Sequence, residues 1–237
     1  MSTEAAWYFP TQRWLRWFLG EYWPTRVQGA ALVPAEGPVI FSGNHPTVLD
    51  GLILALHAPR RVRFLVRGDV MRLPVLGPFL RGLGAITVHR GGDSLQQARM
   101  SLGRGHCLGI FPEADPTFQL QLREFRRGGA VLARDTGASV VPFALRGPEK
   151  LAGRCARYLG SGPVELHFGC PLRAEPQETV EALTQRIRRG VQQLLDSPPL
   201  APAVSTRGLR FACTSALVVP TSALFLRLGP SPSQPLD

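Results

Sequence analysis

A histidine and an aspartate five positions apart are the residues of this sequence best placed to do chemistry. His45 follows the apolar run 37–42, and Asp50 lies in the amphipathic run that comes next. A carboxylate that hydrogen-bonds one imidazole nitrogen fixes the tautomer and leaves the other nitrogen able to accept a proton. Such a pair can deprotonate an alcohol without a nucleophilic serine or cysteine. The spacing alone is a weak signal, because a capping histidine and an ordinary helical aspartate would give the same pattern.

The elements around this pair can be predicted from the pattern of apolar residues. Residues 37–42 form a strand-like run, and a core-facing helix is indicated by the i, i+3, i+4, i+7 spacing of Leu49, Leu52, Ile53 and Leu56. Pro46 suits the first helical position, which would place His45 at the cap. Two residues five apart in a regular helix diverge by about 140°. His45 can therefore reach Asp50 only from outside the helix.

Strand-like and helical runs alternate along most of the chain. The strand-like runs are 28–33, 60–67, 84–90, 107–111, 139–145 and 164–168, and the helical runs are 75–83, 94–102, 127–135 and 178–195. This alternation predicts an α/β fold: a layered, mostly parallel sheet flanked by helices.

The N-terminal segment is unusually aromatic. All four tryptophans fall within the first 23 residues, and a helix there would place Trp14 and Trp17 beside an apolar stripe. Aromatic residues with flanking arginines are typical of a helix that lies in a bilayer interface, so we predict an N-terminal amphipathic aromatic helix of this kind. The alternative is a helix packed across the core of its own domain. Arg13 and Arg16 interrupt the apolar run, which argues against a signal peptide.

Residues 197–205 are rich in proline and small side chains, which indicates a linker or the end of a domain. Beyond them, residues 211–226 carry no charge but contain Pro220. This run is too short for a confident membrane-spanning helix. An interfacial segment, a partner-binding strip and a poorly ordered tail all fit it.

The net charge of +10 comes from 27 basic and 17 acidic residues, and Lys150 is the single lysine. Arginine binds phosphate and carboxylate in a bidentate manner, so this usage fits an anionic substrate or surface. Charge alone fits nucleic acid equally well, but no nucleic-acid-binding motif accompanies it, and we predict no nucleic-acid partner. The four cysteines and five histidines lack metal-ligand spacing. We therefore predict no metal.

Four further blocks follow the histidine–aspartate pair in a suggestive order. They are Gly84–Arg90, Phe111-Pro112-Glu113-Ala114, Phe125-Arg126-Arg127-Gly128-Gly129 and Val140–Ala144. Together with Asn44, His45 and Asp50, this order resembles the glycerolipid acyltransferases, specifically the 1-acylglycerol-3-phosphate (lysophosphatidate) acyltransferase family. The resemblance runs from roughly residue 29 to residue 168.

The resemblance implies roles for individual residues. His45 matches the general base, and Asp50 matches the residue that orients and charges it. Arg90 matches an arginine associated with the acceptor's phosphate, and Glu113 matches a glutamate that helps to shape the acceptor site. Asn44, Arg126 and Arg127 complete the set of expected substrate-binding residues.

The resemblance also implies a reaction and a location. A fatty acyl group would pass from acyl-CoA or acyl-carrier protein to the hydroxyl of a lysophospholipid in phospholipid biosynthesis, with no bound cofactor. Membrane lipids, the lysophospholipid acceptor and the acyl-thioester donor are the expected partners. The protein would lie at the cytoplasmic face of the cell membrane, peripheral or monotopic. We expect an interfacial helical segment at 1–27, the acyltransferase domain at 28–196, and a linker with an apolar tail at 197–237.

One block departs from the family pattern. After Glu113 the family has Gly-Thr-Arg-Ser, whereas this chain has Ala114-Asp115-Pro116-Thr117. Losing the arginine removes a charge-assisted contact worth about 1.5–3 kcal/mol, and Asp115 adds a repelling charge. Arg123, Arg126 or Arg127 could replace the missing cation if the loop folds back. A lipid acceptor without a phosphate, or a catalytically weak lipid-binding protein, would fit the altered block as well.

Overall fold

The computed structural model describes residues 10, 12–14, 16–17, 19–20, 23–72, 74, 77, 80–81, 85–88, 94–151 and 162–200. Its strands are β1 (Thr25–Gln28), β2 (Val39–Gly43), β3 (Val62–Arg67), β4 (Ile86–Val88), β5 (Cys107–Ile110), β6 (Ser139–Arg146) and β7 (Val164–Phe168). They form one sheet in the order β1-β7-β6-β2-β5-β3-β4. Every neighbouring pair is parallel except β6 and β7. The predicted α/β fold with a mostly parallel sheet is therefore confirmed.

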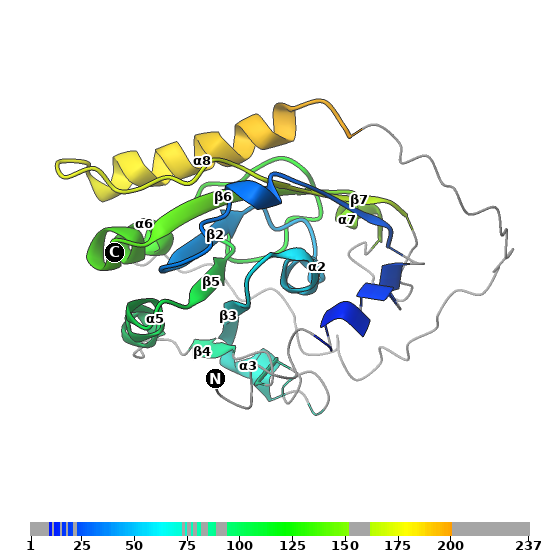
Figure 1. The fold of residues 1–237 in the computed structure, drawn as a ribbon, viewed down its shortest axis with the longest axis horizontal. Coiled ribbons are helices and arrows are strands. Elements are labelled where there is room, and N and C mark those ends of the chain that lie inside the picture. Colours follow the sequence, from blue (N-terminus) through cyan, green and yellow to red (C-terminus); the bar gives the residue numbers. More distant parts are fainter. Residues whose placement is uncertain are drawn as a thin grey trace, which may run out of the picture.

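Helices cover both faces of this sheet (Figure 1). They are α2 (Asp50–His57), α3 (Gly68–Met71), α5 (Ser94–Gly103), α6 (Gly128–Thr136), α7 (Pro148–Leu151) and α8 (Val180–Asp196). In Figure 1, α5, α6 and α8 lie on one side of the sheet and α2 lies on the other. The helices predicted at 94–102, 127–135 and 178–195 are confirmed as α5, α6 and α8. Most of the run predicted as a helix at 75–83 lies outside the described residues.

Two apolar cores arise because successive side chains of a strand point to opposite faces. Phe41 of β2 packs in the core under α2, together with Phe143 of β6. Ile40, which precedes Phe41 in β2, and Val140, its register partner in β6, pack in the second core under α5, α6 and α8. Strands β2 and β6 are buried on both faces, which explains their nearly unbroken apolar sequences. The centre of the sheet is thus a rigid base for whatever follows β2.

The strand predicted at 28–33 is wrong in position. The strand β1 ends at Gln28, and residues Ala30–Leu32 form a short 3-10 helix. Gly29 causes the break, because its φ of 74° is left-handed. A Cβ atom at this position would lie 2.1 Å from the carbonyl oxygen of Phe168, so a side chain cannot be accommodated.

The start of α2 also differs from the prediction. The helix begins at Asp50 rather than at Pro46, and residues 47–49 form a bend and turn. The carbonyls of His45 and Pro46 accept hydrogen bonds from the N–H groups of Thr117 and Phe118, at 2.8 and 2.9 Å. Those carbonyls are therefore engaged by another loop instead of by the helix. His45 lies outside the regular helix, as expected, although it is not its cap.

The described residues between 10 and 20 are helical and lie against α2. Gln12 donates a hydrogen bond from Nε2 to the carbonyl of Ala55 at 2.7 Å, and Leu19 packs against the core. Trp14 and Trp17 are 58% and 72% exposed. One side of this segment thus packs on the domain while two of its tryptophans face outward. None of the helices in the described part of the chain combines the length and hydropathy needed to cross a bilayer.

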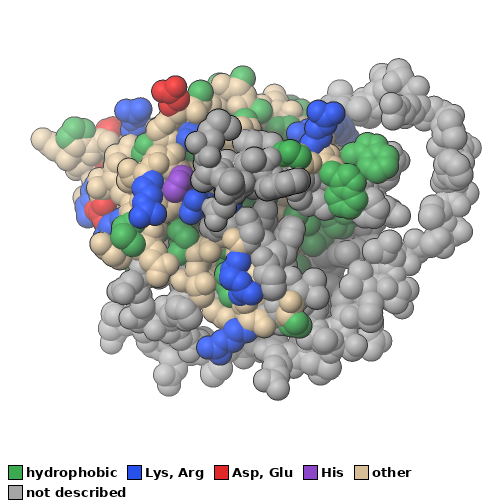
Figure 2. Space-filling view, turned by 60° about the horizontal axis from the view of Figure 1, so that its bottom comes forward, with side chains coloured by type: hydrophobic (Ala, Val, Ile, Leu, Met, Phe, Trp, Pro, Cys, Tyr) green, Lys and Arg blue, Asp and Glu red, His purple; other side chains and the backbone are tan. Residues whose placement is uncertain are grey.

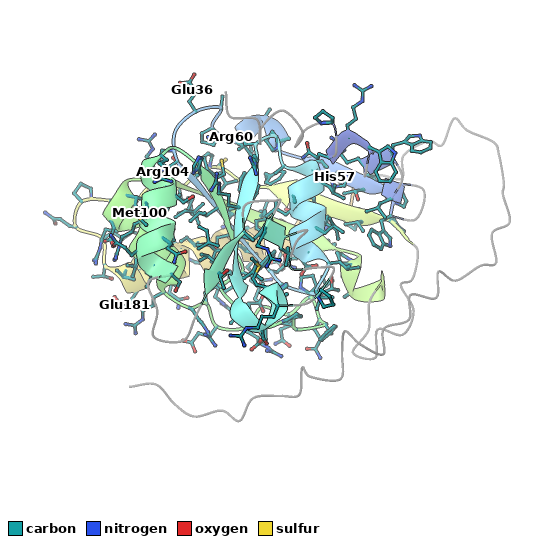
Figure 3. The ribbon with its side chains drawn as sticks, turned by 90° about the horizontal axis from the view of Figure 1, so that it is seen from below. Glu36, His57, Arg60, Met100, Arg104 and Glu181 are labelled. Atoms are coloured by element: carbon teal, nitrogen blue, oxygen red, sulfur yellow. The ribbon has the colours of Figure 1, made fainter. Side chains whose placement is uncertain are left out.

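Basic side chains are spread in separate groups over the face shown in Figure 2. The four labelled residues near the beginnings of the strands, Glu36, His57, Arg60 and Arg104, lie toward the upper edge of Figure 3. Arg60 is held there by the carbonyls of Pro34, Gly37 and Gly105. This arginine therefore ties together three loops at the edge opposite the carboxyl ends of the strands.

Candidate active site

The candidate site lies where two neighbouring parallel strands end. Strand β2 ends at Gly43 and β5 ends at Ile110, and the two strands pair in parallel register. Their carboxyl ends therefore meet at one edge of the sheet, which is where α/β proteins usually place ligands. His45 follows β2 by two residues, and Glu113 follows β5 by three. Segments 68 residues apart in sequence are brought together in this way.

His45 and Asp50 form the predicted pair. The Nδ1 atom of His45 lies 2.8 Å from Oδ2 of Asp50. The side chain of Asp50 is fully buried, whereas the His45 side chain retains 13% of its exposure. With Nδ1 engaged by the carboxylate, Nε2 is the nitrogen left to exchange a proton. This geometry is that of an imidazole general base oriented by an acid.

The carboxylate of Asp50 is held by Thr47 as well as by His45. Oδ2 accepts a hydrogen bond from the Thr47 N–H, and Oδ1 accepts one from the Thr47 hydroxyl, both at 2.8 Å. Burial raises the pKa of Asp50 above its usual value, because a dry environment disfavours charge, and the bonds from His45 and Thr47 oppose that rise. The sequence reasoning missed Thr47. The Thr-x-x-Asp spacing of a capping box was the signal that could have found it.

Asn44 is a buried structural link with only 1% of its surface exposed. Its amide Nδ2 donates to the carbonyl of Leu145, and its Oδ1 accepts from the Leu145 N–H, each at 2.8 Å. The side chain thus continues the pairing of β2 with β6 beyond the end of β2. Both polar groups of the amide are engaged by the backbone, so Asn44 supports the His45 loop from behind.

Glu113 also acts on the protein backbone. Its Oε1 accepts a hydrogen bond from the N–H of His45, and its Oε2 accepts one from the N–H of Arg123, both at 3.0 Å. Only 6% of the residue is exposed. The carboxylate therefore joins the loop after β2 to the loop after β5. Through the His45 N–H it fixes the backbone that carries the imidazole.

The block that departs from the family pattern packs directly on this loop. Besides the backbone bonds from Thr117 and Phe118, the Thr117 hydroxyl bonds the carbonyl of Gln119 at 2.8 Å. Thr117 is almost fully buried. Ala114 has a φ of 69°, a left-handed conformation that suits the glycine of the family pattern better than alanine. A glycine at this position would adopt the same φ without the steric cost that alanine carries.

Of the predicted basic residues, Arg127 forms an ion pair away from His45. Arg127 pairs with Glu181, with Nη1 and Oε1 2.5 Å apart, and both side chains are more than half exposed. Figure 3 shows Glu181 at the left margin of the molecule, whereas α2, which begins at Asp50, lies right of centre. Arg126 is exposed, and its N–H donates to the carbonyl of Pro112. Arg90 lies outside the described residues.

Fold and site together define an α/β protein with a histidine–aspartate pair at the carboxyl edge of its sheet. Residues 24–146, slightly more than half of the chain, match the sequence model of the Acyltransferase family. This chain belongs to that family. The matched region contains the two strands that carry the site, along with His45, Asp50 and Glu113.

The relatives agree with this assignment. A 1-acyl-sn-glycerol-3-phosphate acyltransferase of Neisseria gonorrhoeae is 30% identical over 178 residues, covering 66% of this chain and 69% of that protein. A chloroplastic enzyme of the same name from Brassica napus is 24% identical over 61% of this chain and 43% of its own length. The present chain thus spans less than half of the plant protein.

A solved structure shares the fold. The 1-acyl-sn-glycerophosphate acyltransferase from Thermotoga maritima superimposes with a TM-score of 0.64, over 74% of each chain and at 20% identity. At that identity the likeness concerns the fold, which is the same layered arrangement.

Proposed function

We propose that this protein transfers a fatty acyl group from an acyl thioester to the hydroxyl of a lysophospholipid resembling lysophosphatidate. The observation that carries this proposal is the His45–Asp50 pair, with its 2.8 Å hydrogen bond, buried acid and partly exposed imidazole. Membership of the Acyltransferase family supplies the reaction class. The names of the relatives from Neisseria and Brassica suggest the acceptor.

In the proposed mechanism, Nε2 of His45 removes the proton of the acceptor hydroxyl as that oxygen attacks the thioester carbonyl carbon. Asp50 stabilises the imidazolium that forms. The tetrahedral intermediate then collapses with cleavage of the carbon–sulfur bond, and the imidazolium returns its proton to the departing thiolate. The products are the acylated lipid and free thiol of coenzyme A or acyl-carrier protein. No acyl-enzyme intermediate is needed, and no bound cofactor takes part.

The head group of the acceptor distinguishes two candidate substrates. Pro116 stands where the family pattern has a phosphate-pairing arginine, and the exposed Asp115 adds negative charge nearby. Arg127 is engaged by Glu181. Within the proposed function, Arg90, Arg123 and Arg126 are the cations that would bind an acceptor phosphate. An acceptor without a phosphate is the second candidate, which the Ala114–Thr117 block favours.

The site is proposed to work at the cytoplasmic face of the cell membrane. Trp14 and Trp17 face outward from the helical segment that packs along α2. Val48 and Leu120, on the two loops joined at Pro46 and Phe118, are 46% and 41% exposed. Exposed apolar side chains on the loop that carries His45 and on its neighbour suit an acceptor that remains partly embedded in lipid.

The test is an acceptor panel. The full chain in phospholipid vesicles is incubated with labelled oleoyl-CoA or oleoyl-acyl-carrier protein, and with lysophosphatidate, lysophosphatidylcholine or monoacylglycerol. We expect labelled phosphatidate with at least one donor. Faster transfer to monoacylglycerol than to lysophosphatidate would assign the phosphate-free acceptor. Absence of transfer to every acceptor from both donors would remove the proposed activity and leave a lipid-binding role.

A further inference from the structure

Phe111 lies flat against the imidazole of His45. The two ring centroids are 4.2 Å apart, and the ring planes differ by only 19°. Parallel contact at this distance is a true stack and not an incidental approach of two side chains. Phe111 is the first residue after β5, and it forms none of the hydrogen bonds that hold the pair. The stack is therefore a separate constraint on the ring.

Phe111 is itself held by two more aromatic rings. Phe64 of β3 lies nearly parallel to it, at 6.4 Å and 7°. Phe143 of β6 meets it edge-on, at 5.9 Å and 81°. Phe64 is 5% exposed and Phe143 is fully buried, so both belong to the rigid core. The four rings, His45 included, form an aromatic column that rises from the core to the candidate base.

Two glycines make room for this column. At Gly109 of β5, a Cβ atom would lie 2.5 Å from Cε1 of Phe64. At Gly43, the last residue of β2, it would lie 2.6 Å from the ring of Phe143 and 2.5 Å from its carbonyl oxygen. Real Cβ atoms do not approach other atoms so closely. The sequence therefore keeps space open at two strands for rings that otherwise would have to move.

The column and the carboxylate constrain different motions of the imidazole. Asp50 holds one edge of the ring through Nδ1, and the Phe111 stack limits its rotation about χ2. A π face beside the ring also attracts the positive charge that appears when Nε2 takes a proton. Both effects favour the proton-accepting orientation and the imidazolium that follows it.

We propose that Phe111 is a positioning residue for acyl transfer, which aims the imidazole of His45 and stabilises its protonated form through the aromatic column. The inference rests on the proposed function, because it assigns a partner to the base of that reaction. It predicts that the column acts on kcat and on pH dependence, with little effect on acceptor binding.

The kinetic test replaces Phe111 by Leu, which keeps apolar volume and removes the π face. We expect kcat to fall roughly tenfold while KM changes by about twofold or less. The acidic limb of the pH–kcat/KM profile should move to lower pH by about half a unit, because the protonated imidazole loses a partner. Phe111→Tyr, which retains the ring, should restore both quantities. If Phe111→Leu does not fold, Phe111→Met takes its place.

Phe41→Leu is the matched control. Phe41 is fully buried in the same core and contacts Phe168 rather than His45. We expect it to lower the melting temperature by as much as Phe111→Leu while leaving the acidic limb in place. An equal pH shift in both variants, or none in Phe111→Leu, would reduce the column to ordinary core packing.

A second readout needs no turnover. Ring-current shielding by Phe111 should displace the His45 Hε1 resonance upfield, and in Phe111→Leu this resonance should move back downfield. The chain has five histidines, so the His45 signal can be assigned by its loss in His45→Gln. A resonance that does not respond would overturn the stack. If the resonance responds but the wild type transfers no acyl group, the column stands and the proposed reaction fails.

Discussion

At the scale of single residues, the chemistry depends on a charged group placed where charge is unfavourable. Asp50 is fully buried, and burial raises its pKa, whereas three hydrogen bonds from His45 and Thr47 support its ionised form. The ionised carboxylate therefore supports His45 but lowers the stability of the fold. Removing its charge should lower the activity and raise the stability.

Asp50→Asn tests this trade. An amide can still accept from Thr47 and His45, but it cannot stabilise an imidazolium, so kcat should fall by about 10²- to 10⁴-fold. Because the folded-state pKa of Asp50 is raised, its ionisation disfavours the folded protein as the pH rises above about 3.8. The variant should therefore be as stable as the wild type, or more so, at pH 7, and lose that advantage in acid. Activity assays and melting curves at several pH values measure both effects.

Asp135→Asn provides the control at this scale. Asp135 of α6 pairs with Arg99 of α5, on the other side of the sheet from α2. Its loss should leave kcat unchanged. A similar loss of kcat in both variants would mean that Asp50 has no specific role.

At the scale of elements, the loop after β2 is held from two sides by buried side chains. Asn44 bonds both backbone groups of Leu145, and Glu113 bonds the N–H groups of His45 and Arg123. Sequence reasoning expected both residues to bind the substrate, which stays a prediction, and it did not foresee their hydrogen bonds to the backbone. The role of these side chains in holding the backbone can be assigned only when the order of the strands in the sheet is known. Hydrogen bonds between residues 68 or 101 positions apart cannot be read from local patterns.

Asn44→Ala should weaken the junction of β2 with β6. It leaves the N–H and C=O of Leu145 buried without partners, so the free energy of unfolding should fall by about 2–4 kcal/mol in urea titrations. Thr184→Val is the comparison, because the Thr184 hydroxyl bonds the Val180 carbonyl within α8 and its loss leaves no backbone donor unbonded. That variant should lose about 1 kcal/mol or less. Equal losses would show that the Asn44 bonds have no special weight.

Glu113→Gln distinguishes a residue that holds the loop from one that binds the acceptor. The two oxygens of Glu113 now accept hydrogen bonds from two backbone N–H groups. In glutamine one of these oxygens becomes an NH₂ group, which cannot accept, so one backbone N–H loses its partner. The displaced loop should lower kcat by about tenfold or more and change KM for the acceptor only slightly. Initial-rate kinetics over a range of acceptor concentrations give the two constants. A large rise in KM at unchanged kcat would return Glu113 to the acceptor site.

The boundaries of elements were predicted well where apolar runs were long, and poorly where a glycine or a loop contact decided them. Strands β2, β6 and β7 and helix α8 follow from continuous or periodic apolar residues. Gly29 ended β1 early, and contacts with Thr117 and Phe118 delayed the start of α2. The His45–Asp50 pair was predictable because it is local in sequence. Phe111 was not, because its stack depends on the packing of β2 beside β5.

At the scale of the whole molecule, the candidate active site and the exposed tryptophans lie on different parts of the fold. The site lies at the carboxyl ends of the strands, and the helical segment between residues 10 and 20 packs along α2 with Trp14 and Trp17 outward. The sequence predicted that this segment lies either in a bilayer interface or across the core of the domain. One side of the segment makes the described contacts with the domain. Its exposed tryptophans keep the interfacial interpretation as a proposal.

Replacing both exposed tryptophans tests that proposal. Trp14→Ala with Trp17→Ala should weaken binding to anionic phospholipid vesicles by roughly tenfold or more, because two large apolar side chains no longer enter the interface. Sedimentation with vesicles measures the binding, and the melting temperature should stay nearly constant. Trp23→Ala is the contrast, since Trp23 is 7% exposed and its loss should destabilise the fold. Unchanged vesicle binding in the double variant would contradict interfacial docking.

The most direct test of the central claim is the turnover number of His45→Ala in the full chain. It is measured with the donor and acceptor that the wild type uses best, alongside a melting curve. We predict an intact fold and a kcat lower by at least about 10³-fold, because the proposed mechanism loses the imidazole that Asp50 orients as its base. A folded His45→Ala protein with kcat within about tenfold of the wild type would contradict the assignment of His45 as the base.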